Sequence, residues 1–166
     1  MSAIAGPGRG RSRQLRGLAG FAGVCLAVSA LGGWVTAGSV ETWYVALHKP
    51  AFNPPDRVFG PVWTVLYLMI ALAGWRVWRL CGFGGARVAM LFYALQLSLN
   101  LGWSFLFFGW RSPGLAFAWI LLLLAAILAN MALFRRIDAP AGWLLAPYAC
   151  WVGFAAVLNF AIWRLN

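Results

Sequence analysis

Acidic residues and histidine are almost absent from this sequence. Only Glu41, Asp56 and Asp138 are acidic, and His48 is the single histidine among 166 residues. Structural zinc centres and serine-type catalytic triads both depend on histidine acting together with other ligands or partners. We therefore expect no metal site and no conventional hydrolytic or metal-dependent chemistry.

The few cysteines do not replace these missing groups. Cys25, Cys81 and Cys150 stand far apart, form no CxxC pair and have no histidine at metal-ligand spacing. We interpret them as small residues that face lipid or the protein core.

Charge of either sign is scarce, whereas apolar residues are abundant. The chain is 63% hydrophobic and 10% charged, with a mean hydropathy of +0.81. Each apolar run is close to the length of about 20 residues that crosses a bilayer, and in lipid only helices satisfy the backbone of such a run. We predict an all-α integral membrane protein, a bundle of five transmembrane helices at about residues 17–40, 61–80, 86–108, 113–134 and 142–163.

The N-terminal residues 1–16 differ from the rest in being rich in glycine and arginine. Such a segment is typical of a disordered arm at an anionic membrane surface. A signal peptide is the alternative, because basic residues precede an apolar run and Val28-Ser29-Ala30 resembles a cleavage site. The run is longer than a usual signal core, so we favour a retained helix and a single transmembrane domain over residues 17–166.

Lys and Arg are distributed unequally between the two predicted sides of the membrane. Nine lie on the side of the N terminus and four on the other: Arg9, Arg11, Arg13, Arg16, Arg76, Arg79, Arg87, Arg135 and Arg136 against Lys49, Arg57, Arg111 and Arg164. The positive-inside rule places the N terminus in the cytoplasm and the C terminus opposite. The net charge of +10 arises from these short clusters, so we expect no nucleic-acid partner.

The segment 41–60 contains two of the three acids, the histidine, and Pro50, Pro54 and Pro55. Proline interrupts the helical hydrogen bonds and restricts the residue before it. We therefore expect a structured loop rather than a regular helix through the middle of this segment.

Tryptophan is unusually frequent, with 11 copies. Some fit interfacial belts, but Trp63, Trp103 and Trp151 lie inside their apolar runs. Phe59 and Trp63 share a helical face, as do Trp151, Ala155 and Leu158. Such stripes are either ordinary helix packing or the wall of a pocket, and spacing alone favours packing.

Three amides also lie within the apolar runs. Gln96 and Asn100 share one helical face, and Asn159 lies in the last run. They predict either hydrogen bonds between helices or contacts with a ligand, and the former is more common.

Several extended motifs coincide in order and spacing with one family. They are Trp43-Tyr44-x3-Leu47-x-Lys49-Pro50-x3-Pro54-Pro55, Gly60-Pro61-Val62-Trp63-Thr64-x2-Tyr67, Tyr93-x2-Gln96-x3-Asn100-x2-Trp103, Phe107-Phe108-Gly109 and Pro147-Tyr148-x2-Trp151-x3-Ala155-x3-Asn159-x3-Trp163-Arg164. Over about residues 43–164 the chain resembles the TspO/translocator protein family of tryptophan-rich sensory proteins, which includes the peripheral-type benzodiazepine receptors.

The resemblance implies a five-helix bundle, often a homodimer, with a porphyrin-binding pocket open toward the first loop. The resemblance, read position by position, implies that the pocket is lined by Gly33, Thr36, Phe59, Trp63, Leu115, Trp151, Ala155 and Leu158. We add Trp103, because it lies inside its apolar run. Indole rings would stack on the macrocycle, while His48, Lys49 or Arg57 in the loop would meet its carboxylates.

The expected ligand is a metal-free porphyrin such as protoporphyrin, and no cofactor is required. His48 could serve as an axial ligand of haem iron, but a loop residue is the more common role, so haem is less favoured. Sterol binding is not expected, because Phe160 stands where the family often has tyrosine. Leu115 replaces a tryptophan of some animal members, so we expect the drug-like ligands of those proteins to bind poorly.

We predict a tetrapyrrole-binding sensor or regulator in the membrane. One alternative is light-dependent porphyrin degradation, a reaction that the resemblance would assign to Trp63 and Trp151. The other is transport, which the short chain without repeats disfavours. The arginine-rich N terminus and Ala/Leu-rich runs favour a bacterial membrane, with an organelle membrane as the alternative, and Ala86, Ala89 and Ala94 would permit close packing in a homodimer.

Overall fold

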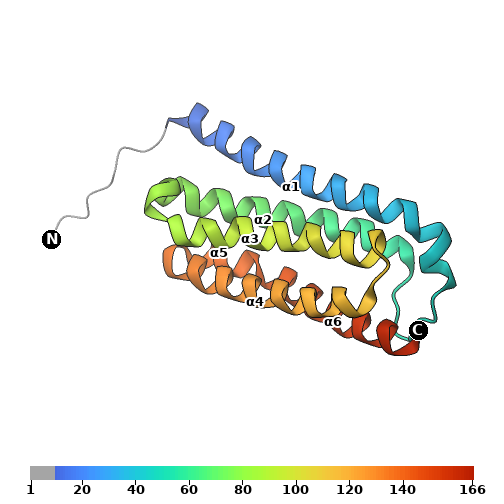
Figure 1. Ribbon diagram of the computed structural model, residues 1–166. Helices are drawn as coiled ribbons and strands as arrows, with labels where there is room; N and C mark the ends of the chain where they lie inside the picture. The colour runs from blue at the N-terminus through green and yellow to red at the C-terminus, as the bar shows by residue number, and fades with distance from the viewer. Residues whose placement is uncertain (1–9) are drawn as a thin grey trace.

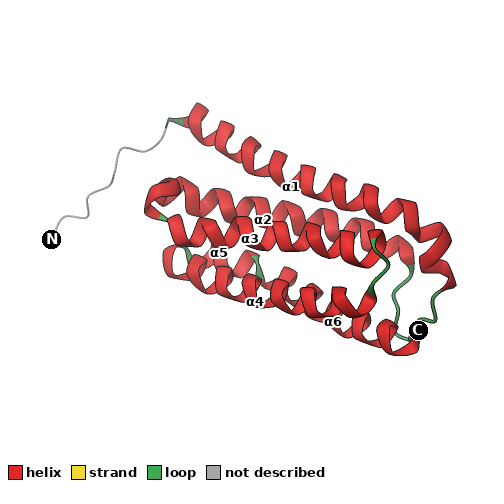
Figure 2. Cartoon of the chain, viewed as in Figure 1, coloured by secondary structure: helices red, strands yellow, loops and turns green. Residues whose placement is uncertain are grey.

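The computed structural model describes residues 10–166, and that part of the chain folds into helices without strands (Figure 2). The helices are α1 (Arg11–Ser39), α2 (Asp56–Gly85), α3 (Arg87–Ser104), α4 (Pro113–Ile137), α5 (Ala139–Leu144) and α6 (Ala146–Leu165). Two π-helical turns, Val40–Tyr44 and Phe105–Gly109, extend α1 and α3. Because the short α5 leads directly into α6, five segments are long and apolar enough to cross a membrane. The prediction of an all-α, five-span bundle is confirmed.

The helices lie side by side along one direction, with α1 at the edge of the bundle (Figure 1). α3 packs on α4, α4 on α6, and α1 on α2. Within α1 only Phe21, Cys25 and Ser39 are buried. Large apolar side chains such as Leu31 and Leu122 face outward, as expected where the solvent is lipid.

The first helix begins earlier than the sequence predicted, at Arg11 instead of Gly17. Arg, Gln and Leu favour helix, and the Trp75 indole donates a hydrogen bond to the Gln14 carbonyl at 3.0 Å, which joins this turn to α2. The expectation of a disordered arm is therefore wrong for residues 11–16, and residues 1–9 lie outside the described residues.

The second helix also begins before its predicted start, at Asp56 rather than Pro61. The Asp56 carboxylate lies in the first turn, where the helix dipole favours negative charge. Pro61 is accommodated inside the helix, where its missing N–H leaves the Arg57 carbonyl without its usual helical partner. Residues 47–55 are not helical, which agrees with the loop expected from the prolines.

The turn from α2 into α3 depends on Gly82. Its φ of 68° lies in a region that side-chain-bearing residues rarely adopt, and the helical path breaks there. The chain can then reverse and enter α3 at Arg87.

α5 lies so close to α4 that Gly142 has no room for a side chain. A β-carbon at Gly142 would collide with the Arg135 side chain and would lie 2.9 Å from the Met131 carbonyl oxygen. By contrast, a β-carbon at Gly153 would meet nothing within 4 Å. Gly142 therefore sets the distance between α5 and α4.

We expect Gly142→Ala to destabilise the protein by about 1–3 kcal/mol, because the added methyl group must displace backbone atoms of α4. Thermal unfolding in detergent measures this as a lower Tm. Gly153→Ala is the matched control and should unfold at or above the wild-type temperature. Equal Tm values for the two variants would contradict the role assigned to Gly142.

A bidentate ion pair joins α2 to the connection between α4 and α5. Arg76 Nε lies 2.6 Å from Asp138 Oδ2, and Arg76 Nη2 donates to Asp138 Oδ1 at 3.1 Å. Asp138 is 12% exposed. The hydrogen bond from Arg76 holds the pKa of Asp138 below its ordinary value, outweighing the opposite effect of burial.

The pKa of Asp138 is lower in the folded protein than in the unfolded chain. The ionised carboxylate therefore stabilises the folded protein above the unfolded-state pKa of about 4, and this stabilisation is lost as pH falls through the folded-state pKa. We expect Asp138→Asn to cost about 1 kcal/mol at neutral pH, with the difference from wild type shrinking below about pH 4. Unfolding measured from neutral to acidic pH tests this. A difference that does not change with pH would show that Asp138 acts through packing rather than charge.

Candidate ligand-binding site

A cavity of about 530 Å³ opens among α1, α2, α3 and α6 at the end of the bundle that carries the loop 45–55. On α1 it is lined by the small residues Ser29, Gly32, Gly33 and Thr36, which share one helical face. Small side chains keep α1 from filling the space that separates it from the other helices.

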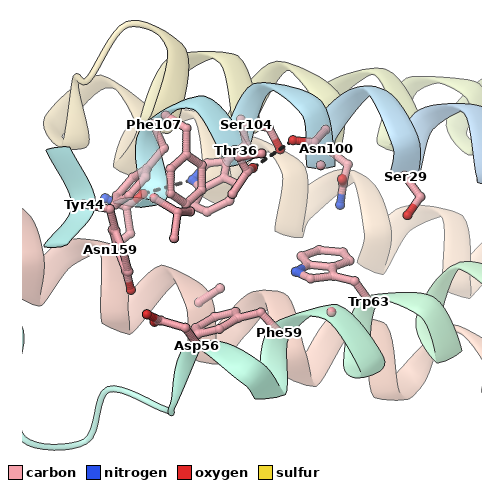
Figure 3. Close-up of a pocket in the computed structure, with 18 of the residues that line it drawn as sticks. Ser29, Thr36, Tyr44, Asp56, Phe59, Trp63, Asn100, Ser104, Phe107 and Asn159 are labelled. Atoms are coloured by element: carbon pink, nitrogen blue, oxygen red, sulfur yellow. Dashed lines mark hydrogen bonds between the residues drawn. The ribbon is translucent and has the colours of Figure 1, made fainter. Parts of the chain in front are cut away.

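Aromatic rings on α2 and α6 form the opposite wall. Phe59, Trp63 and Tyr67 follow one another at helical spacing and all line the cavity. Trp151 of α6 meets Phe59 edge-to-face, with ring centroids 5.9 Å apart. Figure 3 shows Phe59 and Trp63 facing Thr36, Phe107 and Asn100 across the open space.

Trp103 of α3 is held in place from two sides. Its ring stacks on Phe107 with centroids 5.2 Å apart, and its indole N–H donates to Asn159 Oδ1 at 3.0 Å. Asn159 in turn donates to the Pro113 carbonyl at 2.8 Å. This chain of contacts joins α3, α6 and α4 and fixes one aromatic face toward the cavity.

Asn100 connects three helices at the inner part of the cavity. Its Oδ1 accepts from the Tyr67 hydroxyl at 2.7 Å, and its Nδ2 donates to the Tyr148 oxygen at 2.9 Å. Asn100 and Asn159 therefore form the predicted hydrogen bonds between helices, and both also line the cavity. Gln96 is fully buried and does not line the cavity.

The loop 45–55 is attached at both sides of the cavity entrance. The Tyr44 hydroxyl donates to Asn53 Oδ1 at 3.1 Å, and Lys49 Nζ lies 4.1 Å from the centroid of the Tyr44 ring. The side chain of Asn166 accepts from the His48 N–H at 3.0 Å and donates to the His48 carbonyl at 3.1 Å. The C-terminal residue thus ties the loop to the end of α6.

The structure brings together all of the predicted pocket residues except Leu115: Gly33, Thr36, Phe59, Trp63, Trp103, Trp151, Ala155 and Leu158. Leu115 is 48% exposed and lies at a second, smaller hollow beside Trp110 and Trp119. Its neighbour Ala116 is fully buried, so helical periodicity turns Leu115 toward the outside of the bundle. Leu115 therefore lies outside this cavity, contrary to the expectation from the resemblance.

The three loop residues expected to meet ligand carboxylates do not line the cavity. Lys49 lies over the Tyr44 ring, the His48 main chain bonds to Asn166, and Arg57 is exposed. The charged residues that do line the cavity are Glu41 and Asp56. Neither was predicted to line the pocket, although Glu41 begins the segment 41–60 and Asp56 directly follows Pro55.

Tyr67 and Phe107 also line the cavity, and neither was predicted to do so. Tyr67 continues the Phe59 and Trp63 stripe by one further turn, so helical spacing could have identified it. Phe107 lies in a π-helical turn, whose changed periodicity hides its direction from a pattern of 3.6 residues.

Comparison with known proteins agrees with this architecture. Residues 21–164 match the model of the TspO/MBR family. Tryptophan-rich protein TspO of Chlorobaculum tepidum is 42% identical over 162 residues, which cover 93% of this chain and 99% of the relative. The tryptophan-rich sensory protein of Cereibacter sphaeroides is 39% identical (84% and 88% covered), and the translocator protein of Ovis aries is 38% identical (82% of each). The chain therefore belongs to the TspO/MBR family and is an integral membrane protein that crosses the bilayer several times.

Proposed function

We propose that the protein binds a tetrapyrrole such as protoporphyrin in this cavity and acts as a membrane-embedded sensor or regulator. The observation that carries the proposal is the aromatic enclosure: Trp63, Trp103 and Trp151 come from three helices and line one cavity of about 530 Å³. Flat conjugated ligands stack on such rings, and the volume lies within the range of about 300–1,000 Å³ typical of small-molecule sites.

The polar groups of the cavity suit binding better than conventional catalysis. Within the described residues no His, Cys, Lys or Arg side chain lines it. Asn100 and Asn159 are held by hydrogen bonds within the protein. A relative named as a sensory protein supports a sensing role, and the translocator proteins among the relatives make transport the competing proposal.

Replacing Trp151 by leucine should weaken porphyrin binding by about threefold to tenfold, because an apolar side chain remains but the aromatic face is lost. Quenching of tryptophan fluorescence by protoporphyrin in the dark, with the detergent-purified protein, measures the dissociation constant. Trp34→Phe is the control, because Trp34 is 74% exposed and does not line the cavity.

Saturable quenching that Trp34→Phe leaves unchanged and Trp151→Leu weakens would support the proposed pocket. Quenching that never saturates in the wild type would refute tetrapyrrole binding. Equal weakening by both variants would place the ligand outside this cavity.

Photochemical degradation of the bound porphyrin is a second candidate, favoured by the joint placement of Trp63 and Trp151. The two indoles lie on different helices and line the same cavity. Phe59, one helical turn before Trp63, contacts the Trp151 ring. A photoexcited porphyrin, or the reactive oxygen species that it generates, could exchange an electron with either ring without a protein acid or base.

Under illumination we expect new absorbing products in the wild type, and loss of these products in Trp63→Phe/Trp151→Phe. Absorbance spectra recorded after equal light doses measure the change, with porphyrin concentrations chosen so that both proteins are saturated. Trp34→Phe again serves as control. Unchanged product formation in the double variant would exclude the indoles from the reaction.

A transport role would instead produce porphyrin flux across vesicles that contain the protein. The scarcity of charged residues inside the spans disfavours transport coupled to an ion gradient. A flux that saturates with porphyrin and disappears in Trp151→Leu would favour transport over sensing.

We also infer the orientation and assembly of the protein. Arg76, Arg79, Arg87, Arg135 and Arg136 lie at the end opposite the cavity entrance, where α2 meets α3 and α4 meets α5. The positive-inside rule then places that end in the cytoplasm, with the cavity opening to the other side of the membrane, which we take to be bacterial.

A homodimer is proposed on the family resemblance alone. Ala86 and Ala89 are buried inside the bundle, so of these three alanines only Ala94 is exposed to a second copy.

A further inference from the structure

Two of the three acidic residues of this chain line the cavity. Glu41 comes from the π-helical turn that ends the first span, and Asp56 is the first residue of α2. The fold brings them together at the loop end of the cavity, although the loop 45–55 separates them in the sequence. Both residues are exposed.

Within the described residues no cation balances these two charges from the cavity wall. Lys49 is directed to the Tyr44 ring, and the ion pair between Arg76 and Asp138 lies at the other end of the bundle. The wall near the entrance is therefore negative, whereas most of the remaining lining is apolar or aromatic.

Helix stability does not account for both carboxylates. Asp56 lies at a helix N-terminus, where negative charge is favourable, but Glu41 follows the last turn of α1, where the helix dipole makes negative charge unfavourable. Glu41 also forms no ion pair within the described part of the chain. Helix stability therefore gives no reason for a carboxylate at position 41, which lines the cavity.

The cavity has two chemically different ends. Asp56 lies near Tyr44 and Asn159 at one end, while Ser29 and Asn100 lie toward the other (Figure 3). A tetrapyrrole dicarboxylate that pointed its acidic edge at the loop would bring like charges together, and such charges repel at short range. The same ligand without free carboxylates would not incur this cost.

We propose that Glu41 and Asp56 determine the charge specificity of the cavity and select tetrapyrroles whose edge at the loop end is uncharged or cationic. This inference rests on the proposed tetrapyrrole function and specifies its substrate class. It also replaces the expectation that His48, Lys49 and Arg57 receive ligand carboxylates at this site.

The test compares protoporphyrin IX with its dimethyl ester on the wild type and on Glu41→Gln/Asp56→Asn, using fluorescence quenching in one detergent. The ester partitions more strongly into detergent than the free acid does. For each protein we therefore take the ratio of the dissociation constant of the free acid to that of the ester. Comparing this ratio between the wild type and the variant cancels the effect of partitioning. We expect the variant to bind the free acid about fivefold more tightly and the ester unchanged. Unchanged ester binding also shows that the variant is folded.

Two further variants make the result specific. Glu41→Asp keeps the charge and should keep the wild-type ratio. Lys49→Gln removes a cation that contacts the Tyr44 ring but does not itself line the cavity, and it should also leave the ratio unchanged. Weaker binding of the free acid by Lys49→Gln, with no gain in Glu41→Gln/Asp56→Asn, would show that carboxylates face the loop cations and would overturn the inference.

Failure of this inference can be distinguished from failure of the proposed function. If neither porphyrin quenches the wild type saturably, tetrapyrrole binding is refuted, and charge selection is refuted with it. If both bind and the ratio is the same in the wild type and the doubly substituted variant, the protein still binds tetrapyrroles and charge selection alone is refuted.

Discussion

Every peptide group that crosses the hydrocarbon must find its hydrogen-bond partner within the protein, and the whole architecture follows from this constraint. Helices meet it locally, so five apolar segments become five spanning helices. Lipid tails are as apolar as the side chains, so hydrophobic burial contributes little to bringing helices together in the membrane. Close packing and polar contacts between helices must therefore determine how the bundle is arranged.

The buried asparagines provide such contacts at three levels of the bundle. Asn130 donates to the Ala89 carbonyl at 2.9 Å, Asn100 joins Tyr67 and Tyr148, and Asn159 joins Trp103 and the Pro113 carbonyl. Two of these three amides also line the cavity. The bonds that hold α3, α4 and α6 in register thus also fix the aromatic wall, which gives the cavity a defined shape before any ligand arrives.

The sequence was sufficient for the class of fold and for most of the candidate site, for different physical reasons. Apolar length and proline positions determine where helices can run, and helical spacing places Phe59, Trp63, Trp151 and Ala155 on inward faces. The errors came from features without local signals. The hydrogen bond from Trp75 to Gln14 extends α1 to Arg11, and the packing of α4 turns Leu115 outward beside the buried Ala116.

The charge at the cavity entrance shows a further limit of sequence reasoning. Lys49 and Arg57 are neighbours of the pocket residues in sequence, so their cationic groups seemed suited to ligand carboxylates. In three dimensions Lys49 lies over the Tyr44 ring, whereas Glu41 and Asp56 line the cavity. Proximity along the chain indicates which residues lie near this end of the cavity. It does not indicate the sign of the charge there, because that depends on which residues face the cavity.

The edge position of α1 bears on the proposed sensing role. α1 has only three buried residues, and it reaches the rest of the bundle at this end through small residues and through the Ser39 hydroxyl, which donates to the Phe108 carbonyl at 2.7 Å. A ligand that filled the cavity would supply contacts that α1 otherwise lacks, because Gly32, Gly33 and Thr36 would then pack against it. Ligand binding stabilises whichever arrangement of helices it contacts. Ligand binding would therefore change the packing of α1 first, together with the loop that Asn166 joins to the end of α6. Both segments lie at the surface, where a partner protein could detect the change.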